Sequence, residues 1–91
     1  MPLQQTVIEC VHQWSGVTVQ LLSDLLCDLW LRGGHTACDD LAFEDLLQRI
    51  RDGFPNRRIT LMPGDLSPEK GSVKSVRNLV DRVAASQEVE S

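Results

Sequence analysis

The chain has 91 residues, of which 42% are hydrophobic and 24% are charged, and its formal net charge is −4. This length suits one small domain and excludes both a two-domain chain and a large enzyme, while the composition excludes wholesale disorder. The charge is unevenly divided: residues 1–48 hold seven acids and one base, a net −6, whereas residues 49–91 hold eight bases and six acids, a net +2.

The first predicted helix is defined by the spacing of Val7, Val11 and Trp14. Steps of four and three residues keep these apolar side chains on one helical stripe, which we expect to face the core. Gly16 follows Ser15 and favours an end to the helix there.

A second helix is predicted over residues 18–32, before the glycine pair at 33–34. Its apolar positions recur with helical spacing at Leu22, Leu25, Leu26 and Leu29. Further apolar residues widen the stripe beyond one core-facing side, which indicates a central position or a surface for self-association as a homodimer. These residues are Leu21, Trp30 and Leu31.

A third helix is predicted from Asp39 or Asp40 to Asp52, before Gly53. Either aspartate can accept hydrogen bonds from the free N–H groups of the first turn, and both favour the positive end of the helix dipole. The inward stripe consists of Phe43, Leu46, Leu47 and Ile50.

Turn signals dominate residues 55–71, which we expect to form a long ordered loop. A weak strand pattern over residues 58–61 has no evident partner. A last helix is predicted from about residue 72 to 85, followed by a polar tail over 86–91 that we expect to be frayed. The fold class is therefore all-α, a small four-helix bundle, with a single helical domain over residues 1–85.

The three cysteines, Cys10, Cys27 and Cys38, are odd in number and lack Cys-x-x-Cys spacing. This pattern predicts neither a disulfide framework nor a zinc site, and we expect a reducing cytoplasm. Residues 17–31 form the longest apolar-rich stretch but are interrupted by polar residues and fall short of the ~20 that a bilayer requires, so we expect no membrane partner. We also expect no metal, because His35 and Cys38 have no second pair of ligands nearby in the sequence. We expect no catalytic residue, because the aspartates next to Cys38 disfavour its thiolate.

Several segments together resemble the acyl carrier proteins, which carry acyl groups on a phosphopantetheine arm. Residues 39–41, Asp-Asp-Leu, stand where the family has Asp-Ser-Leu, and residues 44–54 are similar to its second principal helix. Residues 75–83 are similar to its closing helix, and residues 11–17 to the end of its first. The resemblance covers most of the chain and implies a carrier-like four-helix fold.

One departure decides the expected function. Family carriers attach the arm to the serine of that tripeptide, because a hydroxyl forms a stable phosphodiester, whereas this chain has Asp40. A carboxylate would form a labile acyl phosphate instead, and no serine lies between Ser23 and Ser67. The resemblance therefore implies a carrier-like domain that has lost the arm, uses no cofactor, is not an enzyme and binds another protein.

The predicted partner is an enzyme of fatty-acid, polyketide or nonribosomal peptide biosynthesis that recognises carrier domains. The predicted binding surface is the start and outer face of the third helix: Asp39, Asp40, Leu41, Asp45, Gln48, Arg49 and Asp52. Two alternatives stay open. One is a functional carrier with another attachment site, and the other is a helical regulator that binds nucleic acid through Arg49, Arg51, Arg57 and Arg58.

Overall fold

The first helix follows the apolar spacing of the sequence. In the computed structural model, which describes residues 2–89, α1 spans Leu3–Ser15 and buries Val7, Val11 and Trp14, each at most 3% exposed. Gly16 ends the helix in the left-handed conformation, with φ of 84°, which glycine adopts at little cost. The predicted first helix and its glycine stop are confirmed.

The second helix is much shorter than predicted. α2 spans Leu26–Arg32, and residues 17–25 before it are irregular. The Val76 N–H donates to the Asp24 carbonyl oxygen at 3.0 Å, and two further backbone hydrogen bonds join the same two segments. The β-branched residues at 17–19 also disfavour a helix. Long-range hydrogen bonds thus replace the local ones, and the prediction of a helix from residue 18 is wrong.

The third helix, α3, spans Asp40–Gly53, so its predicted extent is confirmed within a residue at each end. The Asp39 carboxylate accepts a hydrogen bond from the Ala42 N–H at 3.1 Å and caps the helix. Asp40 is the first helical residue, so an N-cap role for Asp40 is wrong. The predicted inward stripe is confirmed, with at most 1% exposure at Phe43, Leu46, Leu47 and Ile50.

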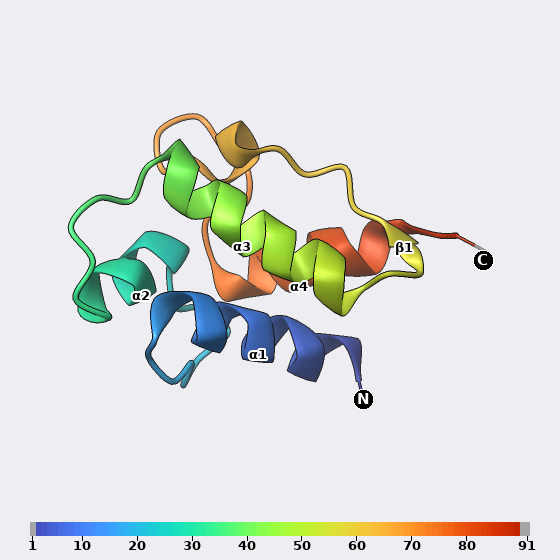
Figure 1. Cartoon of the computed structure of the whole chain (residues 1–91), viewed down its shortest axis with the longest axis horizontal. Helices are drawn as coiled ribbons and strands as arrows, with labels where there is room; N and C mark the ends of the chain where they lie inside the picture. The colour runs from blue at the N-terminus through green and yellow to red at the C-terminus, as the bar shows by residue number, and fades with distance from the viewer. Residues whose placement is uncertain (1, 90–91) are drawn as a thin grey trace.

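A two-residue antiparallel ladder joins the long loop to the end of the chain. In it β1 (Arg57–Arg58) pairs with β2 (Gln87–Glu88), as the position of β1 beside the C-terminal segment in Figure 1 shows. The strand signal predicted over residues 58–61 is thus displaced towards residue 57, and its partner lies in the tail that was expected to be frayed. Residues 90–91 of that tail lie outside the described residues.

The last helix, α4, spans Val76–Ala85 and begins with a reciprocal cap. The Ser75 hydroxyl accepts from the Asn78 N–H at 3.3 Å, and the Asn78 side-chain oxygen accepts from the Ser75 N–H at 3.4 Å. The sequence predicted a start near residue 72. The helix begins later because Ser75 forms an antiparallel bridge to Leu25, which keeps this segment extended.

The helices enclose one hydrophobic core. α1 packs against α2, α3 and α4, and α3 also packs against a short 3-10 helix in the loop, η1 (Pro63–Leu66). Figure 1 shows α1 and α3 running along the long axis of the molecule, with α2 at the end where α3 begins. The four α-helices and little strand found in residues 2–89 confirm the all-α prediction. No helix within residues 2–89 has the length and apolar character to cross a bilayer.

Candidate docking site at the start and outer face of α3

The start of α3 presents two carboxylates and one apolar side chain to solvent. Asp39 and Asp40 are exposed, and Leu41 is 74% exposed, the largest value among the large hydrophobic residues of the described chain. The free N–H groups of the first turn and the aligned peptide dipoles stabilise negative charge at this end of a helix. The fold therefore leaves Leu41 unburied beside two carboxylates that the helix end favours.

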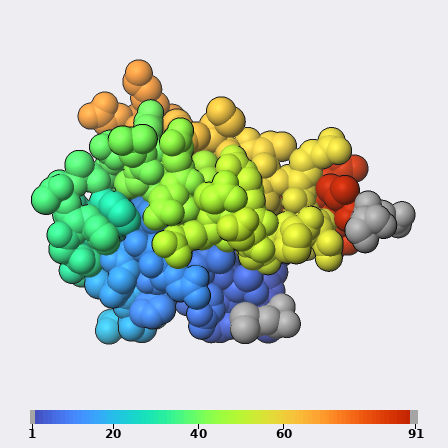
Figure 2. Space-filling model, in the orientation of Figure 1, coloured from blue at the N-terminus to red at the C-terminus, as the bar shows by residue number. Residues whose placement is uncertain are grey.

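The exposed face of α3 continues from this point along the helix. Leu41, Asp45, Gln48 and Asp52 are spaced by four, three and four residues and so lie on one stripe, opposite the buried one. The Gln48 side-chain amide donates to the Asp52 carboxylate at 3.1 Å, and Arg49 Nε lies 3.6 Å from Asp45 Oδ1. Figure 2 shows α3 spread across the centre of one face of the molecule.

The structure places all seven predicted binding residues on α3 or at its cap. None of them belongs to the core: Asp39, Asp40, Leu41, Asp45, Gln48, Arg49 and Asp52. The exposed Asp45–Arg49 pair contributes about 0.3–0.5 kcal/mol to the helix, as is usual for pairs four residues apart. The surface therefore carries charges of both signs around one exposed leucine.

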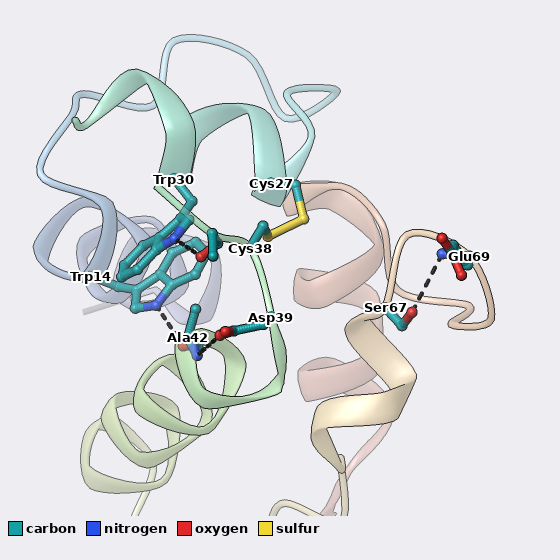
Figure 3. Close-up of a disulfide and its surroundings, with 9 residues drawn as sticks. Trp14, Cys27, Trp30, Cys38, Asp39, Ala42, Ser67 and Glu69 are labelled. Carbon is teal, nitrogen blue, oxygen red and sulfur yellow. Dashed lines mark hydrogen bonds between the residues drawn. A yellow bond between two sulfur atoms is a disulfide. The ribbon is translucent and has the colours of Figure 1, made fainter. Parts of the chain in front are cut away.

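Stacked aromatic rings lie at the start of α3, and Figure 3 shows two of them, Trp14 and Trp30. The buried Trp14 donates its indole N–H to the Ala42 carbonyl oxygen at 2.8 Å, which ties α1 to the first turn of α3. Trp30 stacks on Trp14 with ring centroids 4.7 Å apart, and His35 stacks on Trp30 at 3.6 Å. Trp30 also donates its indole N–H to the Ala37 carbonyl oxygen at 2.5 Å.

The predicted self-association surface is divided by this arrangement. Trp30 is only partly exposed and is engaged in the ring stack, whereas Leu21 and Leu31 are 62% and 51% exposed. Leu21 lies in the irregular segment and Leu31 on α2, so the three residues do not form one helical stripe. Self-association through Leu21 and Leu31 stays a prediction.

Two of the three cysteines form a disulfide, so the prediction that no disulfide forms is wrong. Cys27, on α2, is bonded to Cys38, and their Cα atoms are 5.6 Å apart. The glycine pair at 33–34 allows the chain to turn back after α2, and Gly34 adopts φ of 89°. The two glycines between Cys27 and Cys38 were the feature of the sequence that could have indicated this disulfide. Disulfides are typical of oxidising compartments, so the predicted reducing cytoplasm gains no support from this bond.

Cys10 is the free thiol of the three and is 7% exposed in the core. Burial raises the pKa of the Cys10 thiol, and the charge of Arg49 opposes part of that rise. A thiol that holds its proton more tightly is a poor nucleophile at neutral pH. Cys10 therefore acts as a small apolar core residue.

His35 and Cys38 both make contacts that hold the fold together. The His35 Nε2 atom lies 3.2 Å from the Ser15 carbonyl oxygen, its ring stacks on Trp30, and Cys38 is consumed by the disulfide. Within the described residues, no group of three or more His, Cys, Asp or Glu side chains is placed to hold a metal ion.

The four arginines of the alternative nucleic-acid surface do not form a free basic patch. Arg51 donates to the Leu61 carbonyl oxygen at 3.3 Å, and Arg49 faces Asp45. Arg57 donates to carbonyl oxygens at the end of α4 and also bonds Glu88. Three of the four guanidinium groups therefore have partners within the chain, and two of them, Arg49 and Arg57, lie beside carboxylates that offset their charge.

The resemblance to carrier proteins rests on the residues quoted from the sequence. No family model matches the chain, and neither a curated protein nor a solved structure is significantly similar to it.

Proposed function

We propose that this chain is a carrier-like helical domain that has lost the phosphopantetheine arm and acts, without catalysis, by binding a biosynthetic enzyme. The observation that carries this proposal is the pairing of Asp40 with the exposed Leu41 in the first turn of α3. In the carrier family the corresponding turn begins with the serine that bears the arm. Here the same place holds a carboxylate.

The chemistry of Asp40 supports the loss of the arm. Transfer of phosphopantetheine to a carboxylate would give a mixed anhydride, which water hydrolyses, whereas a hydroxyl gives a lasting phosphodiester. The nearest serines on either side of this turn in the sequence are Ser23, which precedes α2, and Ser67, which follows η1. Neither offers an equivalent hydroxyl at the start of α3.

The composition of the surface indicates the chemistry of the partner. Four exposed carboxylates lie within one helical turn of Leu41 along the chain, Asp39, Asp40, Glu44 and Asp45, and Arg49 lies beside Asp45. A complementary protein surface would hold an apolar pocket for the leucine and basic residues at its rim, where opposite charge speeds association and fixes orientation. Enzymes that bind carrier domains in fatty-acid, polyketide or nonribosomal peptide assembly are the proposed class.

Binding to such enzymes tests the proposal directly. We expect the purified chain to bind at least one enzyme from these three pathways in calorimetry. Leu41→Ala should weaken that binding about tenfold, since truncating an anchor side chain at an interface commonly costs more than 1 kcal/mol. Leu31→Ala removes an exposed leucine from α2 and serves as the matched control, with affinity unchanged. Equal effects of the two substitutions would contradict a docking role for α3.

Modification by a phosphopantetheinyl transferase separates this proposal from a functional carrier. After coexpression with a broad-specificity transferase, the intact mass of the wild-type chain should be unchanged. Asp40→Ser should gain one arm, because serine and aspartate are both tolerated at the start of a helix. A wild-type chain that gains the arm would refute the loss of the attachment site.

A further inference from the structure

The disulfide lies at the entrance to the proposed docking face. Cys38 immediately precedes Asp39, the cap of α3, and Cys27 is the second residue of α2. Figure 3 shows the disulfide joining α2 to the irregular segment that leads into α3. Both cysteines are partly exposed residues at the edge of the core. One covalent bond therefore fixes the residue next to the helix cap.

The backbone around Cys38 has few other restraints. Within residues 2–89, residues 35–38 take part in no backbone–backbone hydrogen bond. The side-chain contacts of residues 35–37 are the His35 ring on Trp30, the His35 Nε2 atom 3.2 Å from the Ser15 carbonyl oxygen, and the Trp30 indole bond to Ala37, and all precede Cys38. The position of Asp39 thus depends on the disulfide on one side and, on the other, on its carboxylate bond to the Ala42 N–H and its carbonyl bond to the Phe43 N–H.

From this placement we propose that the Cys27–Cys38 disulfide is a redox-sensitive switch that controls the start of α3 and hence partner binding at Leu41. This inference rests on the proposed function for its consequence, although the local structural change can be measured without a partner. A dithiol reductant attacks one sulfur, forms a mixed disulfide and then closes on itself. Two electrons and two protons pass to the protein, which gains two thiols, and the reductant leaves as a cyclic disulfide.

Reduction loosens the entrance without removing the helix. The interior of α3 is held by Leu46, Leu47 and Ile50 in the core, two or more helical turns beyond Cys38 along the chain. The first turn is held by the Asp39 cap, whose carbonyl oxygen also accepts from the Phe43 N–H at 3.1 Å. Freeing Cys38 increases the conformational entropy of residues 33–39, so a partner must order the segment that the disulfide had already fixed.

Hydrogen exchange measures the local part of this inference on the intact chain. In the reduced protein we expect the Ala42 and Phe43 amides to exchange at least about tenfold faster than in the oxidised protein. The amides of Leu47 and Ile50, in the middle of the same helix, report on global unfolding and are the internal reference, so the Ala42 and Phe43 amides of the reduced protein should still exchange at least about tenfold faster than theirs. Unchanged exchange at Ala42 and Phe43 would overturn the proposal.

Matched variants separate the disulfide from other effects of the reductant. Cys27→Ser together with Cys38→Ser should reproduce the reduced state and ignore the reductant. Cys10→Ser leaves the disulfide intact and should respond like the wild type. If the double variant does not fold, the comparison of oxidised and reduced wild type decides the question alone.

Binding to the carrier-recognising enzyme identified by calorimetry completes the test. We expect the reduced chain to bind about tenfold more weakly than the oxidised chain, with Cys10→Ser showing the same ratio. Equal affinity of the two redox forms would overturn the switch and leave the docking function standing. Binding by neither form to any enzyme of the three pathways would overturn both proposals.

Discussion

Reduction of the Cys27–Cys38 disulfide should lower the global stability of the domain by an amount that the loop length sets. The two cysteines are 11 residues apart in the sequence. Closing a loop of that size removes about 9 cal/mol/K of entropy from the unfolded chain, which corresponds to about 2.8 kcal/mol at 25 °C. For 91 residues, the unfolding entropy at the midpoint is roughly 0.19 kcal/mol/K, so the midpoint should fall by about 15 °C.

Thermal unfolding followed by circular dichroism measures this shift with and without a dithiol reductant. The double variant Cys27→Ser with Cys38→Ser should unfold at the midpoint of the reduced wild type and be unaffected by reductant. Cys10→Ser should retain the full difference between oxidised and reduced samples. A shift below about 3 °C would refute the reasoning, because the entropy of an 11-residue loop would then be missing.

Three further predictions concern the cap, the end of α4 and the buried thiol. Asp39→Ala should lower the free energy of unfolding in urea by about 1 kcal/mol, because it removes the cap of α3. Asp40→Ala should lower it by less than about 0.5 kcal/mol, because it removes only a favourable interaction with the helix dipole, and equal losses would contradict the assigned cap. Arg57→Ala should cost about 1–2 kcal/mol through its lost bonds to the end of α4, whereas Arg58→Ala, the exposed neighbour, should stay within about 0.5 kcal/mol. Because burial raises the pKa of Cys10 above its ordinary 9.0, the native state holds this proton more tightly than the unfolded chain. The stability that this tighter proton binding contributes is present below pH 9 and is lost above it, so wild type should lose stability relative to Cys10→Ala between pH 7 and 10. Urea midpoints of the two proteins that change equally with pH would contradict this prediction.

The helices that the sequence predicted well are those whose hydrogen bonds are all local. In α3 the apolar spacing, the acidic start and the glycine near its end agree, and the helix forms where they indicate. Residues 18–25 have similar apolar spacing but no helix, because their backbone bonds to residues 74–77, some fifty positions further on. A local periodicity contains no information about that partner.

The disulfide and the β1–β2 ladder were missed for the same reason. Cys27 and Cys38 meet only because the chain reverses between α2 and α3, and Arg57 finds Glu88 only because α4 returns the tail to the loop. Pairings of this kind depend on the three-dimensional path of the chain, which spacing does not describe.

The candidate site was predictable in its position and incomplete in its detail. Its residues follow from a helix that was predicted correctly, so their exposure on α3 was foreseeable from the opposite, apolar stripe. The distinction between Asp39 and Asp40 was not, since both have the chemistry of a cap and only backbone geometry separates them. Nor did the spacing of Trp30 indicate that its ring would lie between Trp14 and His35.

The stacked indoles give the molecule a built-in optical reporter at one end. Trp14 and Trp30 are the two tryptophans of a chain that has no tyrosine, so near-ultraviolet absorption and emission arise almost wholly from this pair. Their light reports on the junction of α1, α2 and the start of α3, while the β1–β2 ladder remains optically silent. Emission and far-ultraviolet dichroism therefore observe different regions, and a difference between their unfolding curves would locate the part of the domain that opens first.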